Sequence, residues 1–517
     1  MKLTGQTIVD ARARQRPGTV VFDTRIREIV IERESETATE IRSFDPSTLQ
    51  PAPAVIVPGL IDSHTHPLET GLQLLFADLR GASSVAEVQQ SLRDRHQDAL
   101  ARGMLLGFNL EPDGLKEQRY PSREELDAVV PEVPVFIYRV DGHSAVTNTA
   151  GLQLVLAGWP GVRARGMDGD CNGRPTGVLR GEAYERASRL FKHRLAPDTV
   201  REALHLAGRQ AAAKGVTTIG ALVGVEDTSD DEWRALLDGL AACAVGTVPY
   251  LQTWNVETPR RFGLKQAGGC LLLDGSFGSR TAALNESYSD APGNSGVSYV
   301  SDEKLLSFLR AAIAAGLQTA LHAIGDRAVE QVVRCHEQLA GPDSGNPLRH
   351  RVEHAELLND ALIDRIAGLG LVLGVQPAFE DEWGGPDRMY SVRLGERWRI
   401  TNPYRRLLDS RVLLAGGSDA PITPIDPIAG IRAAVDRGNS LQAVSGEEAL
   451  AMFTSAASFA LGREATCGSI GVGKDADVTV LTSDPRTSGL CQVVATFRTG
   501  ICIYKNDALA DSLRLEA

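Results

Sequence analysis

Short apolar stretches recur through the middle of the chain, separated by segments with the spacing of amphipathic helices. Eight of these stretches are candidates for buried strands, at residues 55–62, 215–222, 247–254, 270–274, 318–322, 351–354, 371–376 and 412–418. Buried strands that alternate with helices are typical of parallel α/β folds rather than of sandwiches or helical bundles. Eight such units predict an α/β protein built on a (β/α)8 TIM-like barrel.

The two ends of the chain have a different pattern. Residues 1–54 contain short β-like runs and turn residues, and residues 470–517 repeat that style with β-branched alternation and Gly or Asp turns. We therefore predict a small β-sandwich domain formed by the N- and C-terminal segments. The barrel region, residues 55–469, is predicted to carry an insertion at about 100–200, because two further apolar runs lie between its first two strands.

Composition and charge narrow the possible partners. The chain of 517 residues is 43% hydrophobic and 23% charged, as in globular proteins, and its formal net charge is -12. Nucleic acids and anionic membranes bind to basic patches, so we expect a small-molecule substrate and neither of those partners. The first residues lack the apolar run of a secretion signal and no stretch is long enough to span a bilayer, which predicts a cytoplasmic protein.

Four polar clusters each follow a predicted strand: SHTH, HAIGD, VEHAE and GGSDAP. In a parallel barrel, residues just past the strand ends converge on one face, where barrel enzymes carry out their chemistry. The clusters would bring together His64, His66, His322, His354 and Asp419. A single histidine at a strand end is more often structural than a ligand, but the combination of four clusters favours a metal site.

These residue types suit a hydrolytic zinc site. His64 and His66 are separated by one residue on an extended strand, so they point to the same side and can bind one cation together. Imidazoles with a carboxylate suit Zn²⁺, one or two ions per subunit, although another divalent metal would also fit. Water bound to the metal becomes a nucleophile near neutral pH, and Asp419 is placed to accept its proton as a general base.

Longer motifs carry a family resemblance. PGLIDSHTH, HAIGD, VEHAEL and GSDAP occur in the order found in the amidohydrolase superfamily, and the chain resembles that superfamily. DGHSAVTNTAGL, DGSFGSRTAAL, GVQPAF and GSIGVGKDADVTVL narrow the resemblance to the branch of N-substituted formamide deformylase and the YtcJ-like metal-dependent hydrolases. The resemblance covers nearly the whole chain, from about residue 54 to 485.

The resemblance implies a role for each matching residue. His64 and His66 would hold the more buried metal, His322 and His354 the second, and Asp419 would be both ligand and general base. The same motifs imply that the substrate pocket is lined by His143, Asp274, Ser276 and Arg280. Family habit also implies a possible homo-oligomer.

One position departs from the pattern of this branch. A Lys that bridges two metals when carboxylated usually lies four residues before the DGS motif, and Cys270 stands there in this chain. A thiolate is a good zinc ligand and carries the same negative charge, so we predict that Cys270 ligates or bridges the metals. Two alternatives stay open, because the site could hold a single metal without Cys270, or Cys270 could be inert.

The predicted reaction is hydrolysis of an amide-type C–N bond. Hydrolysis of a cyclic amide or an ester, deamination, and a non-catalytic ligand-binding or regulatory barrel remain alternatives. Residues 377–408 follow the seventh predicted strand and could form a substrate loop, with Trp383, Tyr390 and Arg405 facing the ligand. A solvated surface loop with packing aromatics is an equally good interpretation of that segment.

Overall fold

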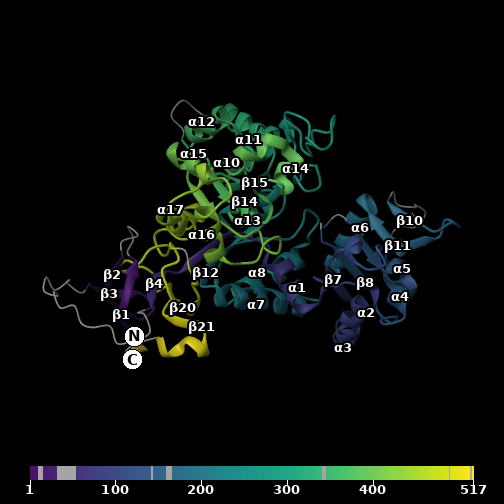
Figure 1. Ribbon diagram of the computed structural model, residues 1–517, viewed down its shortest axis with the longest axis horizontal. Coiled ribbons are helices and arrows are strands. Elements are labelled where there is room, and N and C mark those ends of the chain that lie inside the picture. The colour runs from purple at the N-terminus through teal and green to yellow at the C-terminus, as the bar shows by residue number, and fades with distance from the viewer. Residues whose placement is uncertain are drawn as a thin grey trace. The chain divides into compact units, whose positions relative to one another are not determined.

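The computed structural model describes residues 1–9, 15–31, 54–140, 142, 144–158, 166–340, 345–487, 489–512 and 515–516 (Figure 1). The chain divides into two compact units. The first comprises Met1–Pro67, Gly208–Asp227 and Cys243–Ala517, and the second comprises Leu68–Ala207 and Thr228–Ala242. The eight predicted barrel strands all fall within the first unit.

Eight parallel strands form the centre of the first unit. Their bounds are β5 (Leu60–Thr65), β12 (Val216–Val223), β13 (Gly246–Leu251), β14 (Gln266–Leu272), β15 (Gln318–Ala323), β16 (Arg351–His354), β17 (Val372–Val375) and β18 (Leu414–Gly416). Backbone hydrogen bonds join them in the orders β13-β12-β5 and β14-β15-β16-β17-β18. β13 is a neighbour of β14, and Thr65 forms a parallel bridge with Ala420 beyond β18. This is the strand order of a TIM-type barrel.

The helices of this unit lie between and after the strands. α7 (Pro197–Ala213) leads into β12 across the boundary between the two units. The others are α9 (Glu257–Arg261), α10 (Asp302–Ala314), α11 (Asp326–Leu339), α12 (Asp360–Leu369), α13 (Ala378–Trp383), α14 (Met389–Leu394), α15 (Tyr404–Asp409), α16 (Pro427–Val435), α17 (Gly446–Met452) and α18 (Ser455–Ala460). α12 shows how local sequence sets their ends: the Asn359 side chain accepts a hydrogen bond from the amide of Leu362, and Gly370 ends the helix with a φ of 65°.

The first predicted strand is in fact two strands. Residues 55–62 were expected to form one barrel strand, but β4 (Val55–Pro58) belongs to the terminal sheet and β5 begins only at Leu60. Pro58 has no amide hydrogen to extend a ladder, and Gly59 passes so close to Thr217 that an added Cβ would lie 2.3 Å from its hydroxyl oxygen. The chain therefore changes sheets at this Pro-Gly pair.

Strands from both ends of the chain pair in one sheet of eight strands. Its order is β21-β20-β19-β4-β1-β2-β3, and β22 pairs with β1. The remaining bounds are β1 (Lys2–Val9), β2 (Gln15–Phe22), β3 (Ile26–Ile31), β19 (Val478–Leu481), β20 (Val493–Arg498), β21 (Ile501–Lys505) and β22 (Leu515–Glu516). Ile56, Val478 and Phe497 contribute to an apolar core of its own.

The second unit contains a separate sheet of six strands in the order β10-β11-β9-β8-β7-β6. Its strands are β6 (Ala77–Asp78), β7 (Leu105–Leu110), β8 (Val135–Arg139), β9 (Ser144–Thr147), β10 (Met167–Gly169) and β11 (Pro175–Arg180). Its helices are α1 (Pro67–Leu75), α2 (Val85–Asp94), α3 (His96–Arg102), α4 (Arg123–Asp127), α5 (Thr149–Ala157), α6 (Gly181–His193) and α8 (Asp230–Ala241). Two apolar runs of the predicted insertion are thus β7 and β8.

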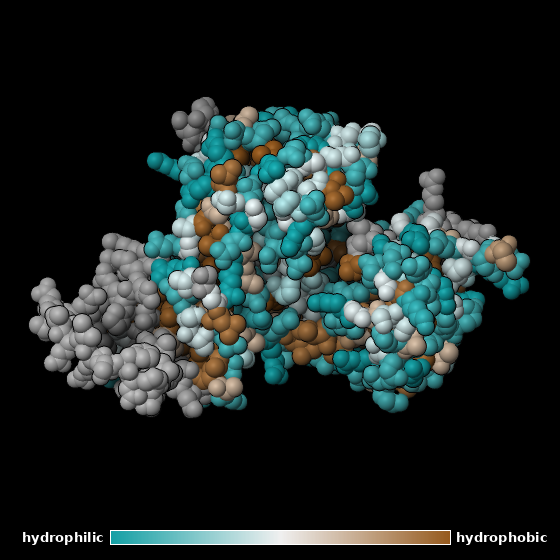
Figure 2. Space-filling model, viewed as in Figure 1, coloured by the Kyte–Doolittle hydropathy of each residue, from teal (hydrophilic) through white to brown (hydrophobic). Residues whose placement is uncertain are grey.

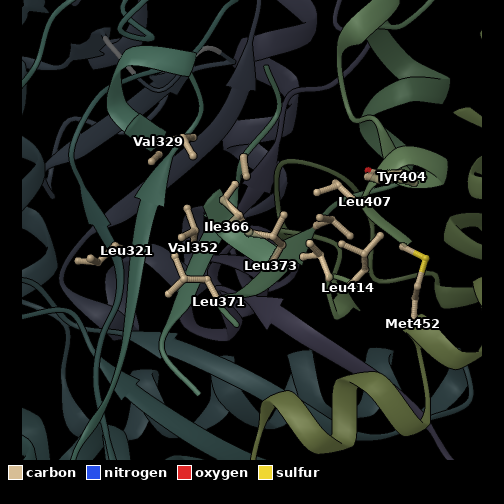
Figure 3. Packing of buried hydrophobic residues seen from close by; sticks show 14 of the residues in the cluster. Leu321, Val329, Val352, Ile366, Leu371, Leu373, Tyr404, Leu407, Leu414 and Met452 are labelled. Atoms are coloured by element: carbon tan, nitrogen blue, oxygen red, sulfur yellow. The ribbon is translucent and has the colours of Figure 1, made fainter. Parts of the chain in front are cut away.

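The main core lies between the outer face of the parallel strands and their helices. Figure 3 shows Leu321, Val352, Leu373 and Leu414, one from each of β15 to β18, packed with side chains of the surrounding helices. Successive residues of a strand point to opposite faces. The residues next to these four therefore point into the space that the strands enclose, which leads to the functional site.

One face of the molecular surface is shown in Figure 2. Figure 2 shows a mainly hydrophilic surface over α10, α11 and α12, with scattered apolar side chains. Among the described residues, no helix combines the length and the apolar character that crossing a bilayer requires.

We expect Leu373→Ala to destabilise the protein strongly. Leu373 is fully buried in the main core, and removing its side chain leaves a cavity that costs about 2–5 kcal/mol. Thermal and denaturant midpoints should both fall. Leu441→Ala is the matched control, because Leu441 is 81% exposed, and equal midpoints for the two variants would contradict this assignment of the core.

Candidate metal centre

The six predicted ligands lie where the parallel strands end. His64, Cys270, His322 and His354 are in β5, β14, β15 and β16, whereas His66 follows β5 and Asp419 follows β18. All are buried except His66, whose side chain is 16% exposed. Strands that are far apart in sequence thus bring these side chains to one place, as the strand-end clusters predicted.

Asp419 joins the two histidines of the first strand. Its Oδ1 lies 3.2 Å from Nε2 of His64 and 3.2 Å from Nε2 of His66. The ligand atoms of these three residues all lie within 4.8 Å of one another, the spacing of a group that could hold one metal ion.

Cys270 lies among the other histidines. Its Sγ is 3.5 Å from Nδ1 of His322 and 3.8 Å from Nε2 of His354, and the ligand atoms of His64, Cys270 and His354 form a second group within 4.8 Å. A β-bulge just before Cys270 sets its direction: Gly268 and Gly269 have φ values of 89° and 102°, and the pairing register of β14 shifts there.

Hydrogen bonds to protein oxygens orient three of the imidazoles. Nδ1 of His64 contacts Oε2 of Glu353 at 2.6 Å, and Nδ1 of His354 contacts Oε1 of Gln376 at 2.8 Å. Both partners accept, so each ring donates its Nδ1 hydrogen and keeps an Nε2 lone pair. Nε2 of His322 likewise lies 3.2 Å from the carbonyl oxygen of Gly275, which leaves Nδ1 to face Cys270.

Glu353 and Gln376 contact two of the candidate ligands but were not predicted from the sequence. Both stand inside motifs that were recognised, VEHAE and GVQPAF. Glu353 directly precedes His354 in β16, and Gln376 directly follows the apolar strand β17, but the imidazole that each would contact could not be predicted.

The backbone at two ligands is in the left-handed region. His354 has a φ of 72° and Asp419 a φ of 55°, conformations that cost non-glycine residues free energy and that cluster at functional sites. The Asp419 segment is held by its amide, which donates to the carbonyl of His64 at 2.8 Å. The Ser418 amide also donates to Oδ1 of Asp62 at 3.0 Å. These contacts tie the end of β18 to β5.

The centre favours negative sulfur and oxygen ligands. Burial by itself raises the pKa of Cys270, but the field of His322 and hydrogen bonds from the imidazoles hold it well below its usual range. Burial opposes ionisation of Asp419 as well, yet its contacts with His64 and His66 keep that pKa well below its usual range. Burial lowers the pKa of His66, but the negative Asp419 and Cys270 beside it raise that pKa to about 10. A thiolate and a carboxylate are therefore ready to bind a cation.

The donor set fits zinc. Nε2 of His64 is fully buried and makes no hydrogen bond, although Asp419 Oδ1 is near it. In a tetrahedral zinc site, two nitrogen or oxygen ligands of the same ion are roughly 3.3 Å apart. The distance of 3.2 Å between His64 Nε2 and Asp419 Oδ1 therefore fits two ligands of one zinc ion. A thiolate and a nitrogen on one zinc are roughly 3.6 Å apart, which matches Cys270 and its two histidine neighbours.

Three predicted substrate residues have their polar groups bound to protein partners. The buried carboxylate of Asp274 accepts hydrogen bonds from the amides of Ala283, Ile324 and Gly325. Tyr390 is buried and donates to Glu356, and Arg405 on α15 pairs with Glu448 and Asp409. In this structure these side chains brace loops and helices, and their contact with a substrate stays a prediction.

The other predicted substrate residues are placed as follows. Ser276 contacts Ser279, Arg280 pairs with Asp290, and Trp383 packs on Phe379 with ring centroids 4.8 Å apart. His143 lies outside the described residues. Contact of these four with a substrate stays a prediction.

Comparison with known proteins agrees with this geometry. Residues 54–495 match the model of the amidohydrolase family. The chain belongs to the amidohydrolase family. It is 31% identical to the putative amidohydrolase YtcJ of Bacillus subtilis (strain 168), over 84% of each chain, and 27% identical to N-substituted formamide deformylase of Arthrobacter pascens, over 91% of this chain and 92% of that one. The predicted branch is confirmed.

A solved structure extends the likeness. An uncharacterised metal-dependent hydrolase from Pyrococcus furiosus has a TM-score of 0.76 and 26% sequence identity, over 94% of this chain and 99% of that one. The fold of this amidohydrolase is accordingly of the TIM-barrel type, and the chain is a metal-dependent hydrolase with residue groups at the strand ends that could hold a metal ion.

We expect Gly417→Ala to break the metal centre without changing a ligand. A Cβ at this position would lie 2.7 Å from both the backbone nitrogen and the Cβ of His64, where backbone cannot give way, so Asp419 would be pushed away from β5. Zinc content and melting temperature should both fall. In the control Gly471→Ala the new Cβ meets only the Lys474 side chain, at 3.8 Å, so zinc content and melting temperature should stay unchanged. Full zinc content in Gly417→Ala would contradict the role of the contact between the end of β18 and β5.

Proposed function

We propose that this amidohydrolase uses zinc to cleave an amide-type C–N bond of a small molecule. The observation that carries the proposal is the convergence of four imidazoles, the Cys270 thiolate and the Asp419 carboxylate at the strand ends. The relative from Arthrobacter pascens, named for removing a formyl group from N-substituted formamides, supports this choice of bond. We also infer that the eight parallel strands close as a (β/α)8 barrel and that the terminal sheet folds over its own core as a small sandwich.

Two metal positions are proposed. His64, His66 and Asp419 would hold one ion, His322 and His354 the second, and the Cys270 sulfur, which lies between the groups, would contact both. Bound there, zinc polarises the carbonyl of the substrate and lowers the pKa of water.

Asp419 has the catalytic part in this proposal. Its carboxylate remains ionised because His64 and His66 hold its pKa low, so it can take a proton from the attacking water. The oxygen of that water adds to the carbonyl carbon, the C–N bond breaks, and Asp419 returns the proton to the leaving nitrogen. The products are a carboxylic acid and an amine, and no other reactant is needed.

Asp419→Asn should abolish turnover. An amide cannot accept the proton, and losses of about 10²–10⁴-fold are usual when a general base is removed. Release of free amine from a panel of N-formyl and N-acyl amines measures this, and chelation of the metal should abolish the same activity until zinc is restored. Asp198→Asn, at a side chain 90% exposed, should keep full activity. Ammonia release would indicate deamination instead, and tight binding without any turnover would indicate a binding protein.

Cys270→Ala should lower the zinc content. If Cys270 is a shared ligand, elemental analysis should show near two zinc ions per wild-type chain and the loss of one or both in the variant. Cys335→Ala is the matched control, because it removes a fully buried thiol from α11, away from the ligands. Equal zinc content in wild type and Cys270→Ala would make Cys270 a bystander.

A further inference from the structure

The space enclosed by the parallel strands contains a buried ion pair in direct contact with a metal ligand. Arg351 and Glu353 are each only 1% exposed, and they lie two residues apart on β16, on the face opposite Val352 of the main core. Arg351 donates through Nε to Oε1 of Glu353 at 2.8 Å and through a terminal nitrogen to Oε2 at 2.9 Å. Oε2 also accepts the Nδ1 hydrogen of His64, so both carboxylate oxygens are used.

Further hydrogen bonds fix the arginine from the other side. Arg351 donates to the carbonyl of Ser63 at 3.2 Å and contacts the Tyr250 hydroxyl at 3.3 Å. That hydroxyl donates to Gln318 at 2.7 Å, and Gln318 donates to the carbonyl of Ala460 at 2.9 Å. A continuous chain of hydrogen bonds thus runs from α18, through the enclosed space, to the ring of His64.

Stability alone does not account for this pair. Taking two charges out of water costs as much free energy as their attraction returns, and apolar residues of similar size often serve as well. Several neighbours in the same space, among them Ala320, Val372 and Ala415, are small and apolar. A charged pair in that setting points to a specific task.

A neighbouring glycine makes room for the pair. On β17, a Cβ at Gly374 would lie 2.0 Å from Oε2 of Glu353 and 2.7 Å from a terminal nitrogen of Arg351. This position can therefore carry no side chain while the pair is in place, although its backbone conformation is an ordinary one.

We propose that Glu353, braced by Arg351, is a positioning residue that locks His64 as an Nε2 ligand and thereby sets the zinc affinity of the site. A charged acceptor on Nδ1 fixes the tautomer and the ring plane, and raises the basicity of Nε2. The inference rests on the proposed zinc-dependent function, but it concerns residues that contact neither metal nor substrate.

The test measures zinc affinity directly in the full-length protein. In Glu353→Gln, competition against a chelator of known affinity should show zinc binding weakened about 10–100-fold, as for other partners of metal-bound histidines. The visible spectrum of the cobalt-substituted protein should change as well, because the His64 ring is no longer held by a carboxylate. Unchanged affinity and spectrum would overturn the proposal.

A double variant separates positioning from stability. Glu353→Gln alone leaves Arg351 as an uncompensated buried charge, so it should also lower the melting temperature. Arg351→Met combined with Glu353→Gln removes both charges, and should recover the melting temperature while zinc affinity stays low. Recovery of both would show that the pair is merely structural.

Gly374→Ala tests the position of Glu353 by a change on the neighbouring strand, β17. It should displace Glu353 and weaken zinc binding, although it changes neither the pair nor a ligand. Gly368→Ala is the matched control, because nothing lies within 4 Å of an added Cβ on α12, and its zinc affinity should equal that of wild type. If wild-type protein binds no zinc at all, the proposed function fails; if wild type binds tightly and Glu353→Gln and Gly374→Ala bind equally well, only this inference fails.

Discussion

The ring of His64 is held on both of its nitrogens, and the geometry of the centre depends on that. One nitrogen donates to Glu353 inside the barrel-type sheet, and the other faces Asp419, which arrives from the last strand of the series. The backbone repeats the connection, because the Asp419 amide donates to the carbonyl of the same histidine. The first and last strands of the series are thus joined at His64 itself, by a backbone hydrogen bond and by the approach of Asp419 to its ring.

Because side chains alternate between the two faces of a strand, the short strand β16 contributes both to the main core and to the candidate metal centre. On β16, Val352 packs outward against helices, while Arg351 and Glu353 point inward and His354 ends the strand as a candidate ligand. Four consecutive residues therefore belong to the core, to the contact that orients His64 and to the candidate metal centre. Substitutions there cannot be assigned to one role by position alone.

The sequence allowed the candidate ligands and the strand series to be predicted because both leave local signals. A histidine or aspartate that follows an apolar run is visible without knowing any contact, and this located His64, His322 and Asp419. The change of sheets at Gly59 was missed, because the reason is a close approach to Thr217, far along the chain. The partners of Tyr390 and Arg405, which are Glu356 and Glu448, could not be predicted for the same reason, because they become neighbours only after folding.

The sheet made from both ends has a consequence for synthesis of the chain on the ribosome. Strand β4 leads through Pro58 and Gly59 directly into the strand that bears His64, and its two neighbours in the sheet are β1 from the start of the chain and β19 from near its end. β4 emerges early and must wait, with one edge unpaired, until β19 has been made. During translation that edge of β4 stays open until residues 478–481 have been made, and an unpaired strand edge is a place where another chain can pair.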